Sequence, residues 1–351
     1  MRVAVHSRTG WGPLSTGRED GIALLVVLLT ITLLTVVVVE FTYSSQVEIH
    51  LALSGRNALQ ATYLARSGVN IAEAILIRDA QMNPTDSEQD LWARPLPPLP
   101  VGDGTVALRV RDEARALNVN DMLSSGVLRP ERHLVFERLF DLLGIDKSIL
   151  AAIVDWIDAD QEPWVSPAGA EQPYYFGLTP PVEVRNGPLV TLRELLLVRG
   201  ITPSLLARLD GFATVLPPGG RLRVNVNTAP PEVLYALSEA LAAEPGIVDR
   251  LIAARREKPF SSPSELRDIP GLAEALGSGL DDFIDTKSAY FRIEAVGAVN
   301  DVARGILTTV KRETLGRRIT RLSWTPTTAN LSLTSQPPSD FLDALPPLGG
   351  S

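Results

Sequence analysis

The sequence predicts an α+β fold with an N-terminal apolar helix and an antiparallel sheet that is interrupted by a large α-helical insertion. Three observations predict it: an uncharged apolar run at residues 22–39, strand-like alternation on both sides of the chain's middle, and helical patterns through that middle. With 351 residues the chain is long enough to bury a sizeable core in more than one domain.

The composition excludes several classes of function. A formal net charge of −8 argues against a protein whose main ligand is a phosphate backbone. There is no cysteine, and the three histidines (His6, His50 and His133) are scattered, so neither a thiolate metal site nor a histidine-based catalytic site is expected. No phosphate-binding loop or nucleophile-elbow motif occurs. A binding or structural protein without catalytic activity is therefore expected.

The apolar run Ile22–Val39 contains no charged residue, glycine or proline. As a helix its 18 residues would reach about 27 Å, close to the roughly 30 Å of a bilayer core. A cleaved secretory signal would need a small-x-small site after the run, and the sequence Glu40–Tyr43 offers none. A soluble core helix would show a polar stripe, which is also missing. We therefore expect a retained membrane anchor.

Flanking charge predicts the orientation of this anchor. Arg2, Arg8 and Arg18 precede the run, whereas the first basic residue after it is Arg56. Because the basic side of a span stays in the cytoplasm, residues from 40 onward are expected to be exported.

The same helix is expected to continue into the exported region. No proline occurs between Pro13 and Pro84, so a helix can run unbroken from Ile22 to about Asp79. A stripe of small residues follows the membrane at helical spacing: Ala58, Ala61, Ala65, Gly68, Ala72 and Ile75. We favour packing of this stripe on the protein's own sheet over a dimerisation surface. The proline-rich stretch that follows is expected to be loop.

Strand patterns flank the helical middle. Val106–Val110 alternates as a half-buried strand does, with Ala114–Val119 as its expected partner. Tyr290–Val299 and Ala303–Lys311 read as a hairpin that turns at Asn300-Asp301. The C-terminal stretch from residue 315 is rich in Pro, Ser and Thr, and most of it is expected to be poorly ordered.

The helical middle holds a weak repeat and raises a rival function. Residues 191–202 and 264–273 each read as a short helix, a glycine turn and a second helix, and between them Asn227 or Thr228 is expected to cap a helix. Residues 225–272 resemble the helix-hairpin-helix module of competence DNA receptors, whose backbone N–H groups bind a phosphate. Four cations could assist there: Arg250, Arg255, Arg256 and Lys258. The second hairpin, Pro270–Ala275, has no basic residue, and none follows before Lys287. This favours a packing unit, while a membrane-tethered DNA receptor remains the alternative.

An acidic segment lies inside this middle. Between Ser148 and Val184 there is no Lys or Arg, but six carboxylates: Asp155, Asp158, Asp160, Glu162, Glu171 and Glu183. Like charges this close require water or a cation. The spacing is not that of an EF-hand, because the sixth position from Asp158 is Pro163 and the twelfth is Gly169. The segment is open to three interpretations: a solvated loop, a cation site or the carboxylate pair of a glycosidase. Carboxylates this crowded favour metal ligands over the separated acid and base of a glycosidase.

In combination these features resemble one family, the K-type minor pseudopilins of type II secretion systems (general secretion pathway protein K). Gly21 directly before the apolar run resembles a prepilin processing site, and Val26 stands where most pilins carry glutamate as fifth mature residue. The block Asp155–Asp160, the stretch Leu192–Gly200 and the Asn-Val-Asn-Thr-Ala element at 225–229 follow in the family's order.

The resemblance implies a pilin-like sheet with an inserted α-helical domain of helix-hairpin-helix or SAM-like repeats. It implies cleavage by prepilin peptidase after Gly21, methylation of Ile22, and a single-pass anchor in the inner membrane with the C-terminal part in the periplasm. It further implies a place at the tip of a short pseudopilus with I-, J- and H-type minor pseudopilins as partners, and no nucleic acid.

The family's insertion domain binds calcium, and here Asp158, Asp160, Glu162 and Glu171 are the expected ligands of a structural Ca²⁺. The expected organisation is a leader at 1–21, a transmembrane segment at 22–39, the pilin helix and first strands at 40–121, the inserted helical domain at 122–288, closing strands at 289–313 and a flexible tail at 314–351.

Overall fold

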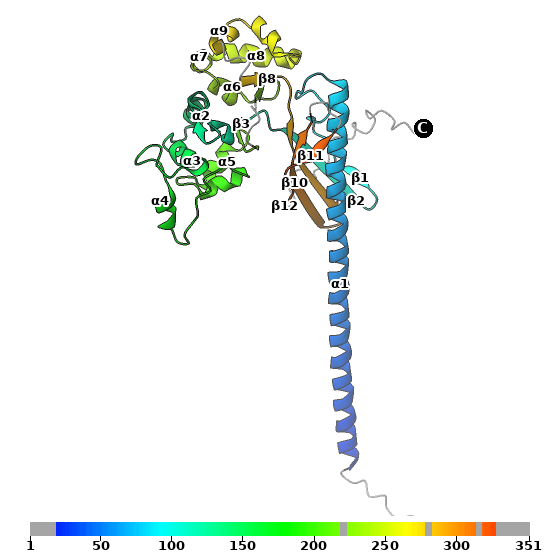
Figure 1. Ribbon diagram of the computed structural model, residues 1–351. Helices are drawn as coiled ribbons and strands as arrows, with labels where there is room; N and C mark the ends of the chain where they lie inside the picture. The colour runs from blue at the N-terminus through cyan, green and yellow to red at the C-terminus, as the bar shows by residue number, and fades with distance from the viewer. Residues whose placement is uncertain (1–18, 218–222, 278–282, 314–317, 328–351) are drawn as a thin grey trace, which may run out of the picture. The chain divides into compact units, whose positions relative to one another are not determined.

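The computed structural model describes residues 19–217, 223–277, 283–313 and 318–327 (Figure 1). The chain divides between Leu59 and Gln60 into two compact units. Helix α1 (Glu19–Met82) contributes to both. Its length confirms the unbroken helix expected from the absence of proline. Most of the leader expected at 1–21 lies outside the described residues.

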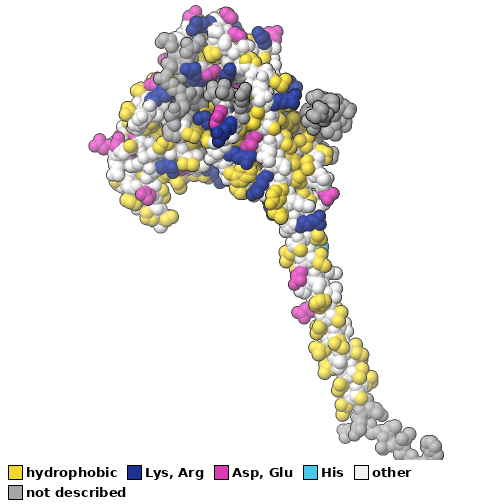
Figure 2. All heavy atoms as spheres, turned by 45° about the vertical axis from the view of Figure 1, so that its right-hand side comes forward, with side chains coloured by type: hydrophobic (Ala, Val, Ile, Leu, Met, Phe, Trp, Pro, Cys, Tyr) yellow, Lys and Arg dark blue, Asp and Glu magenta, His cyan; other side chains and the backbone are white. Residues whose placement is uncertain are grey.

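The described part of the first unit is the N-terminal part of α1, which is long and apolar enough to cross a membrane. Its most apolar 18-residue window has a mean hydropathy of 3.2 and is 0% buried. Hydrophobic side chains follow one another along it (Figure 2). The only polar side chains of the run belong to three threonines, and each hydroxyl donates to the carbonyl four residues earlier: Thr30 to Val26, Thr32 to Leu28 and Thr35 to Ile31. No polar group of the run is thus left to seek water.

The second unit contains an antiparallel sheet in the order β1-β2-β9-β10-β11, with β12 also paired to β10. Its strands are β1 (Leu99–Val101), β2 (Gly104–Asp112), β9 (Tyr290–Val299), β10 (Val302–Arg312), β11 (Ile319–Arg321) and β12 (Thr325–Thr327). The predicted strands at 106–110, 290–299 and 303–311 are confirmed. The hairpin between β9 and β10 turns at Asn300, whose φ of 52° lies in the left-handed region that asparagine tolerates.

The stripe of small residues on α1 packs against this sheet, as expected. Ala61, Ala65 and Ala72 are each 0% exposed. A Cβ on Gly68 would lie 2.8 Å from Val106 of β2, and one on Gly297 of β9 would overlap the α1 backbone. Helix and sheet therefore approach so closely that glycine is required on both surfaces.

Three sequence expectations in this unit are wrong. Ala114–Val119 does not pair with β2, because the backbone N–H of Ala114 donates to Asp112 Oδ1 and the chain turns away from the sheet. Within that stretch only β3 (Leu117–Asn118) is a strand, and it pairs in parallel with β6 (Ala213–Thr214). The proline-rich stretch contributes β1, which forms a hairpin with β2.

The stretch from residue 314, expected to be a flexible tail, also contributes to the sheet. Residues 318–327 run along β10 as β11 and β12, and between them the N–H groups of Leu322 and Ser323 both face Thr309 O. Residues 328–351 lie outside the described part of the chain.

The insertion between β2 and β9 is mainly helical (Figure 1). Its helices are α2 (Pro130–Leu143), α3 (Ile149–Ile157), α4 (Gln172–Phe176), α5 (Pro203–Leu209), α6 (Pro231–Ala236), α7 (Glu239–Ala243), α8 (Pro245–Glu257) and α9 (Leu272–Leu276), with 3₁₀ helices η1 (Val119–Met122), η2 (Leu192–Leu197) and η3 (Pro263–Asp268). Besides β3 and β6, the described part of the insertion contains the short strands β4 (Leu123–Ser124), β5 (Val127–Leu128), β7 (Val224–Asn225) and β8 (Ile284–Asp285).

The internal repeat appears as two matching turns. In each, a 3₁₀ helix is followed by a glycine in the left-handed region and a short helix: η2, Gly200 (φ 83°) and α5, then η3, Gly271 (φ 82°) and α9. The expected cap at Asn227 or Thr228 is wrong, since α6 begins after Pro230. Asn227 instead exchanges two hydrogen bonds with the backbone of Phe260, and this fixes the entrance to α6 against the end of α8.

A buried polar network joins the insertion to the sheet. Asn225 of β7 donates to Asp112 at the end of β2 and to Ser288, which precedes β9. The Asp112 carboxylate also accepts from the hydroxyls of Ser288 and Thr228. Burial nevertheless raises the pKa of Asp112 to about 6, because the hydrogen bonds only partly offset its desolvation.

Candidate metal centre

The acidic block begins inside α3, whose sequence ILAAIVDWI is buried on almost every side. Asp155 lies within that helix and is 0% exposed, and Asp158 ends it in an extended conformation. Carboxylates at the C-terminal end of a helix face the negative end of its dipole, so both are unfavourably placed unless another group compensates them.

Three carboxylates converge at this point. One oxygen each of Asp155, Asp158 and Glu171 lies within 4.8 Å of the others, and all three residues are buried. Glu171 directly precedes α4, and its side chain makes no capping hydrogen bond. The chain between Asp158 and Glu171 therefore forms a loop whose two ends meet in a group of like charges.

Asp155 is held by the backbone of this loop. Its Oδ1 accepts from the N–H of Trp164 at 2.8 Å and its Oδ2 from the N–H of Ala170 at 2.6 Å. A side chain at Gly169 would overlap Asp155 Oδ2, so closure of the loop depends on glycine at that position. The Trp164 ring packs on His133 of α2 with centroids 4.5 Å apart, which fixes the outer side of the loop.

The carboxylates of Asp158 and Glu171 contain oxygens that accept no hydrogen bond from the described residues. Among the described residues, Asp158 Oδ1 and both carboxylate oxygens of Glu171 are buried and accept no hydrogen bond. The same holds for Oδ1 of nearby Asn186, whose Nδ2 donates to the carbonyl of Asp160 at 3.1 Å. A buried acceptor without a donor is costly, so these oxygens mark a place for a positive ligand or a proton.

The pKa shifts agree with this geometry. Burial raises the pKa of Asp158 to about 7, and the charges of Asp160, Glu171 and Asp155 add to the effect. Burial, together with the charges of Asp155 and Asp160, also raises the pKa of Glu171 to about 7. The pKa of Asp155 rises for the same reason and is partly restored by its two N–H donors. Near neutral pH the group is thus poised between binding protons and binding a cation.

The donor set fits a hard divalent cation. The three carboxylates offer only oxygens, and no described histidine belongs to the group. Calcium takes six to eight oxygen ligands in flexible geometry, which suits carboxylates that hold no other partner.

The structure brings together two of the four ligands predicted from sequence, Asp158 and Glu171. Asp160 and Glu162 are exposed and lie outside the group, and Asp160 Oδ1 accepts from the N–H of Glu162 at 2.9 Å. Sequence reasoning missed Asp155 as a ligand. Its spacing of three from Asp158 was the available signal, since it places both on one face of a helix.

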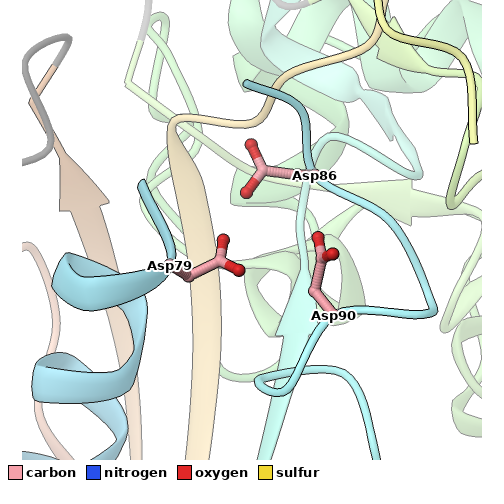
Figure 3. A group of neighbouring side chains, drawn as sticks. All are labelled: Asp79, Asp86 and Asp90. Atoms are coloured by element: carbon pink, nitrogen blue, oxygen red, sulfur yellow. The ribbon is translucent and has the colours of Figure 1, made fainter. Parts of the chain in front are cut away.

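A second acidic group is of a different kind. Asp79 near the end of α1 and Asp90 in the following loop point toward one another, with Asp86 above them (Figure 3). Here the protein supplies its own cation: Arg312 Nη2 lies 2.6 Å from both oxygens of Asp86, and Arg312 Nη1 lies 3.5 Å from Asp79 Oδ2. Burial and the charge of Asp90 raise the pKa of Asp79 to about 6. This group is an internal ion-pair network.

The cations that could contact DNA are partly engaged inside the protein. Arg255 Nη1 donates to the carbonyls of Val226 and Ala229 at 2.6 and 2.8 Å. Arg250 Nη2 donates to the carbonyl of Pro270 at 2.9 Å, across the second glycine turn. These bonds hold helices together, which favours a packing role for the repeat.

Comparisons with known proteins agree in one family. The family models for type II secretion system protein K match residues 115–218 and 224–288. The chain is 31% identical to the type II secretion system protein K of Aeromonas hydrophila over 304 residues, which cover 82% of this chain and 91% of that protein. It is 28% identical to the protein of the same name from Pseudomonas aeruginosa, with 84% and 89% covered.

A solved structure shares the fold. The match is to a chain of the GspK-GspI-GspJ complex of the enterotoxigenic Escherichia coli type 2 secretion system, with a TM-score of 0.67 and 19% identity. It covers 79% of this chain and 99% of the other.

Proposed function

Because this chain belongs to the protein K family of the type II secretion system, we propose that it is a non-catalytic minor pseudopilin that caps the tip of a periplasmic pseudopilus and supports protein export. One observation carries the proposal. The single helix α1 supplies an exposed apolar segment in one unit and the packing surface of an antiparallel sheet in the other, and a helical insertion interrupts that sheet. Helix α1 is then both the membrane anchor and a part of the core under the sheet.

The proposed location is the inner membrane, crossed once, with the sheet and the insertion in the periplasm. The apolar side chains from Ile22 to Val39 are exposed, and lipid is the solvent that such a surface requires. The arginines before the run keep the N-terminus in the cytoplasm.

The proposed maturation is cleavage by prepilin peptidase between Gly21 and Ile22, followed by methylation of the new terminal amine. Both residues lie at the start of α1, and apart from α1 itself nothing that the structure describes lies within 4 Å of the position of a Cβ on Gly21.

The tip position follows from Val26, the fifth residue of the mature chain. In a pilus the terminal amine of each added subunit is neutralised by a glutamate at this position of a neighbour, because an unpaired charge in lipid costs several kcal/mol. A subunit with valine there cannot form this pair through its own side chain. It fits the end of the fibre, where no subunit lies above it.

The proposed partners are other minor pseudopilins of the I, J and H types. The solved structure with the same fold was determined as a complex of GspK with GspI and GspJ. We extend that association to this chain and add the H type from the family resemblance.

The proposed cofactor is a structural calcium ion. Asp155, Asp158 and Glu171 would hold it, with the buried Oδ1 of Asn186 as a further oxygen and with Asp160 and Glu162 as outer ligands. The ion would neutralise three buried carboxylates and fasten the two ends of the acidic loop. A glycosidase is less well supported, because carboxylates crowded within 4.8 Å of one another suit the ligands of one ion better than a separated acid and base.

Crosslinking mass spectrometry of isolated pseudopili tests the tip assignment. One copy per fibre, crosslinked to two or more smaller pseudopilins, is expected. Many copies spaced along the fibre would contradict it, even if cleavage after Gly21 were established. A membrane-tethered DNA receptor, the alternative, predicts no association with pseudopili at all.

A further inference from the structure

We propose that Arg199 is the positioning residue of the metal centre, because it binds the backbone before Glu171 and the tyrosine side chains after it. The proposal rests on the calcium site proposed above. Arg199 stands between η2 and Gly200, outside the acidic segment, and is half-buried.

On the first side, Arg199 holds the end of the acidic loop. Its Nη1 donates to the carbonyl of Pro167 at 3.0 Å and to that of Gly169 at 3.1 Å. Gly169 is the residue whose lack of a side chain lets the loop close over Asp155, and it lies two residues before Glu171. A guanidinium that binds two carbonyls from alternate residues fixes the direction of the chain as it enters the site.

On the second side, Arg199 holds the start of α4. Its Cζ lies 4.8 Å from the centroid of the Tyr174 ring, and its backbone N–H donates to the hydroxyl of Tyr175 at 3.0 Å. Tyr175 is fully buried against Trp156, the residue after Asp155, with ring centroids 5.1 Å apart. The contact therefore ties α4 back to the helix that carries the first carboxylate.

Neither carboxylate oxygen of Glu171 has a hydrogen-bond partner among the side chains that the structure describes, so the path of the backbone on both sides of it strongly affects where the carboxylate points. Arg199 binds the backbone before Glu171 and contacts tyrosine side chains after it. Without it, the carboxylate is free to leave a site in which its burial is unfavourable. Partners that orient metal ligands typically contribute about 10- to 100-fold to metal affinity.

The charge of Arg199 and its hydrogen bonds are expected to have opposite effects on calcium affinity, which makes the proposal testable. A guanidinium beside the centre repels a divalent cation, so removal of its charge alone would strengthen calcium binding. Loss of its hydrogen bonds would weaken binding instead. Lysine keeps the charge but cannot bind both carbonyls and stack on the ring in the same geometry.

The experiment is calorimetric calcium titration of the full-length chain in detergent, as wild type, R199K, R199Q and, as control, R193Q, which removes an exposed arginine of η2. We expect both Arg199 variants to weaken calcium binding by about tenfold or more, and R193Q to match the wild type. Wild-type affinity in R199K, or tighter binding by R199Q, would overturn the positioning role. Failure of the wild type to bind calcium would overturn the metal centre itself.

Near-ultraviolet circular dichroism in chelator shows whether each variant is folded before calcium is added. If Arg199 variants do not fold, Y174L answers the same question, because it removes the stacking partner at a position that is 40% exposed. A two- to fivefold loss of calcium affinity is expected for Y174L, whereas wild-type affinity would contradict the proposal.

Discussion

Arg312 donates through one nitrogen, Nη2, to both carboxylate oxygens of Asp86, at 2.6 Å each. The side chains are 8% and 2% exposed. Asp86 Oδ2 also accepts from the N–H of Ser288, and its carbonyl accepts from Asn225. One ion pair thus connects the end of β10 and the loop after α1 with β7 of the insertion and with the segment that returns to β9.

Replacing Arg312 with methionine should destabilise the protein by about 3–5 kcal/mol, since Asp86 and Asp79 would stay buried without their cation. Urea unfolding of the full chain in detergent measures this. R304M is the matched control: it lies on the same strand but is exposed, and should change stability by about 0.5 kcal/mol or less. Equal effects of the two substitutions would show that the buried pair has no special role.

Calcium should stabilise the protein more strongly as pH rises. The pKa values of Asp158 and Glu171 are raised to about 7 in the folded protein, so the metal-free form binds protons that the unfolded chain releases. The stability these groups contribute is present below about pH 4 and is lost as pH rises toward 7. Calcium binds the deprotonated form, so the increase in melting temperature on calcium addition should be larger at about pH 8 than at about pH 5.5.

Substitutions of single carboxylates distinguish the metal ligands from the other acidic residues in that measurement. E171Q should remove most of the calcium-dependent shift, whereas E183Q, an exposed carboxylate of the same segment, should leave it unchanged. A shift of the same size at both pH values would contradict the assignment of these carboxylates, and no shift at millimolar calcium would leave a solvated acidic loop.

Cleavage should occur after Gly21. The mass of the protein extracted from membranes of cells with active prepilin peptidase should correspond to residues 22–351 with one added methyl group. The same cells without the peptidase provide the control and should yield residues 1–351. A full-length species in both would exclude processing at this bond.

The exported region should not bind duplex DNA. Arg255 and Arg250 donate to backbone carbonyls, and the second hairpin lacks basic residues, so few cations remain to contact phosphates. Gel-shift assays at low micromolar protein and low salt should show no complex. A salt-sensitive complex that disappears on charge reversal of Arg255 and Arg256 would instead support the DNA receptor.

Local patterns were sufficient for the long elements of the fold. The absence of proline predicted α1, and alternation predicted β2, β9 and β10, because each signal lies within the element itself. The partner of β2 could not be found in this way. Ala114 turns away because its N–H bonds Asp112, and the true partner, β9, begins 178 residues after Asp112 in the chain.

The candidate site, too, could be predicted only in part from local sequence. The sequence identified the acidic segment and two of its converging carboxylates, but Asp155 sits inside an apolar helix, and its burial depends on a loop that returns 15 residues later to donate from Ala170. Asn186 and Arg199 carry no local signal at all. Their relation to Glu171 is set by the path of the chain after α4.

The edge strand formed by residues 318–327 has a consequence for how copies of this protein can associate. An open strand edge recruits other strands and leads to aggregates. Here β11 and β12 cover β10, and opposite Ile306 the covering strand carries Pro326, which has no N–H to offer to a further chain. Pro326 thus interrupts the row of donors along this edge, which hinders the addition of a further strand from another copy.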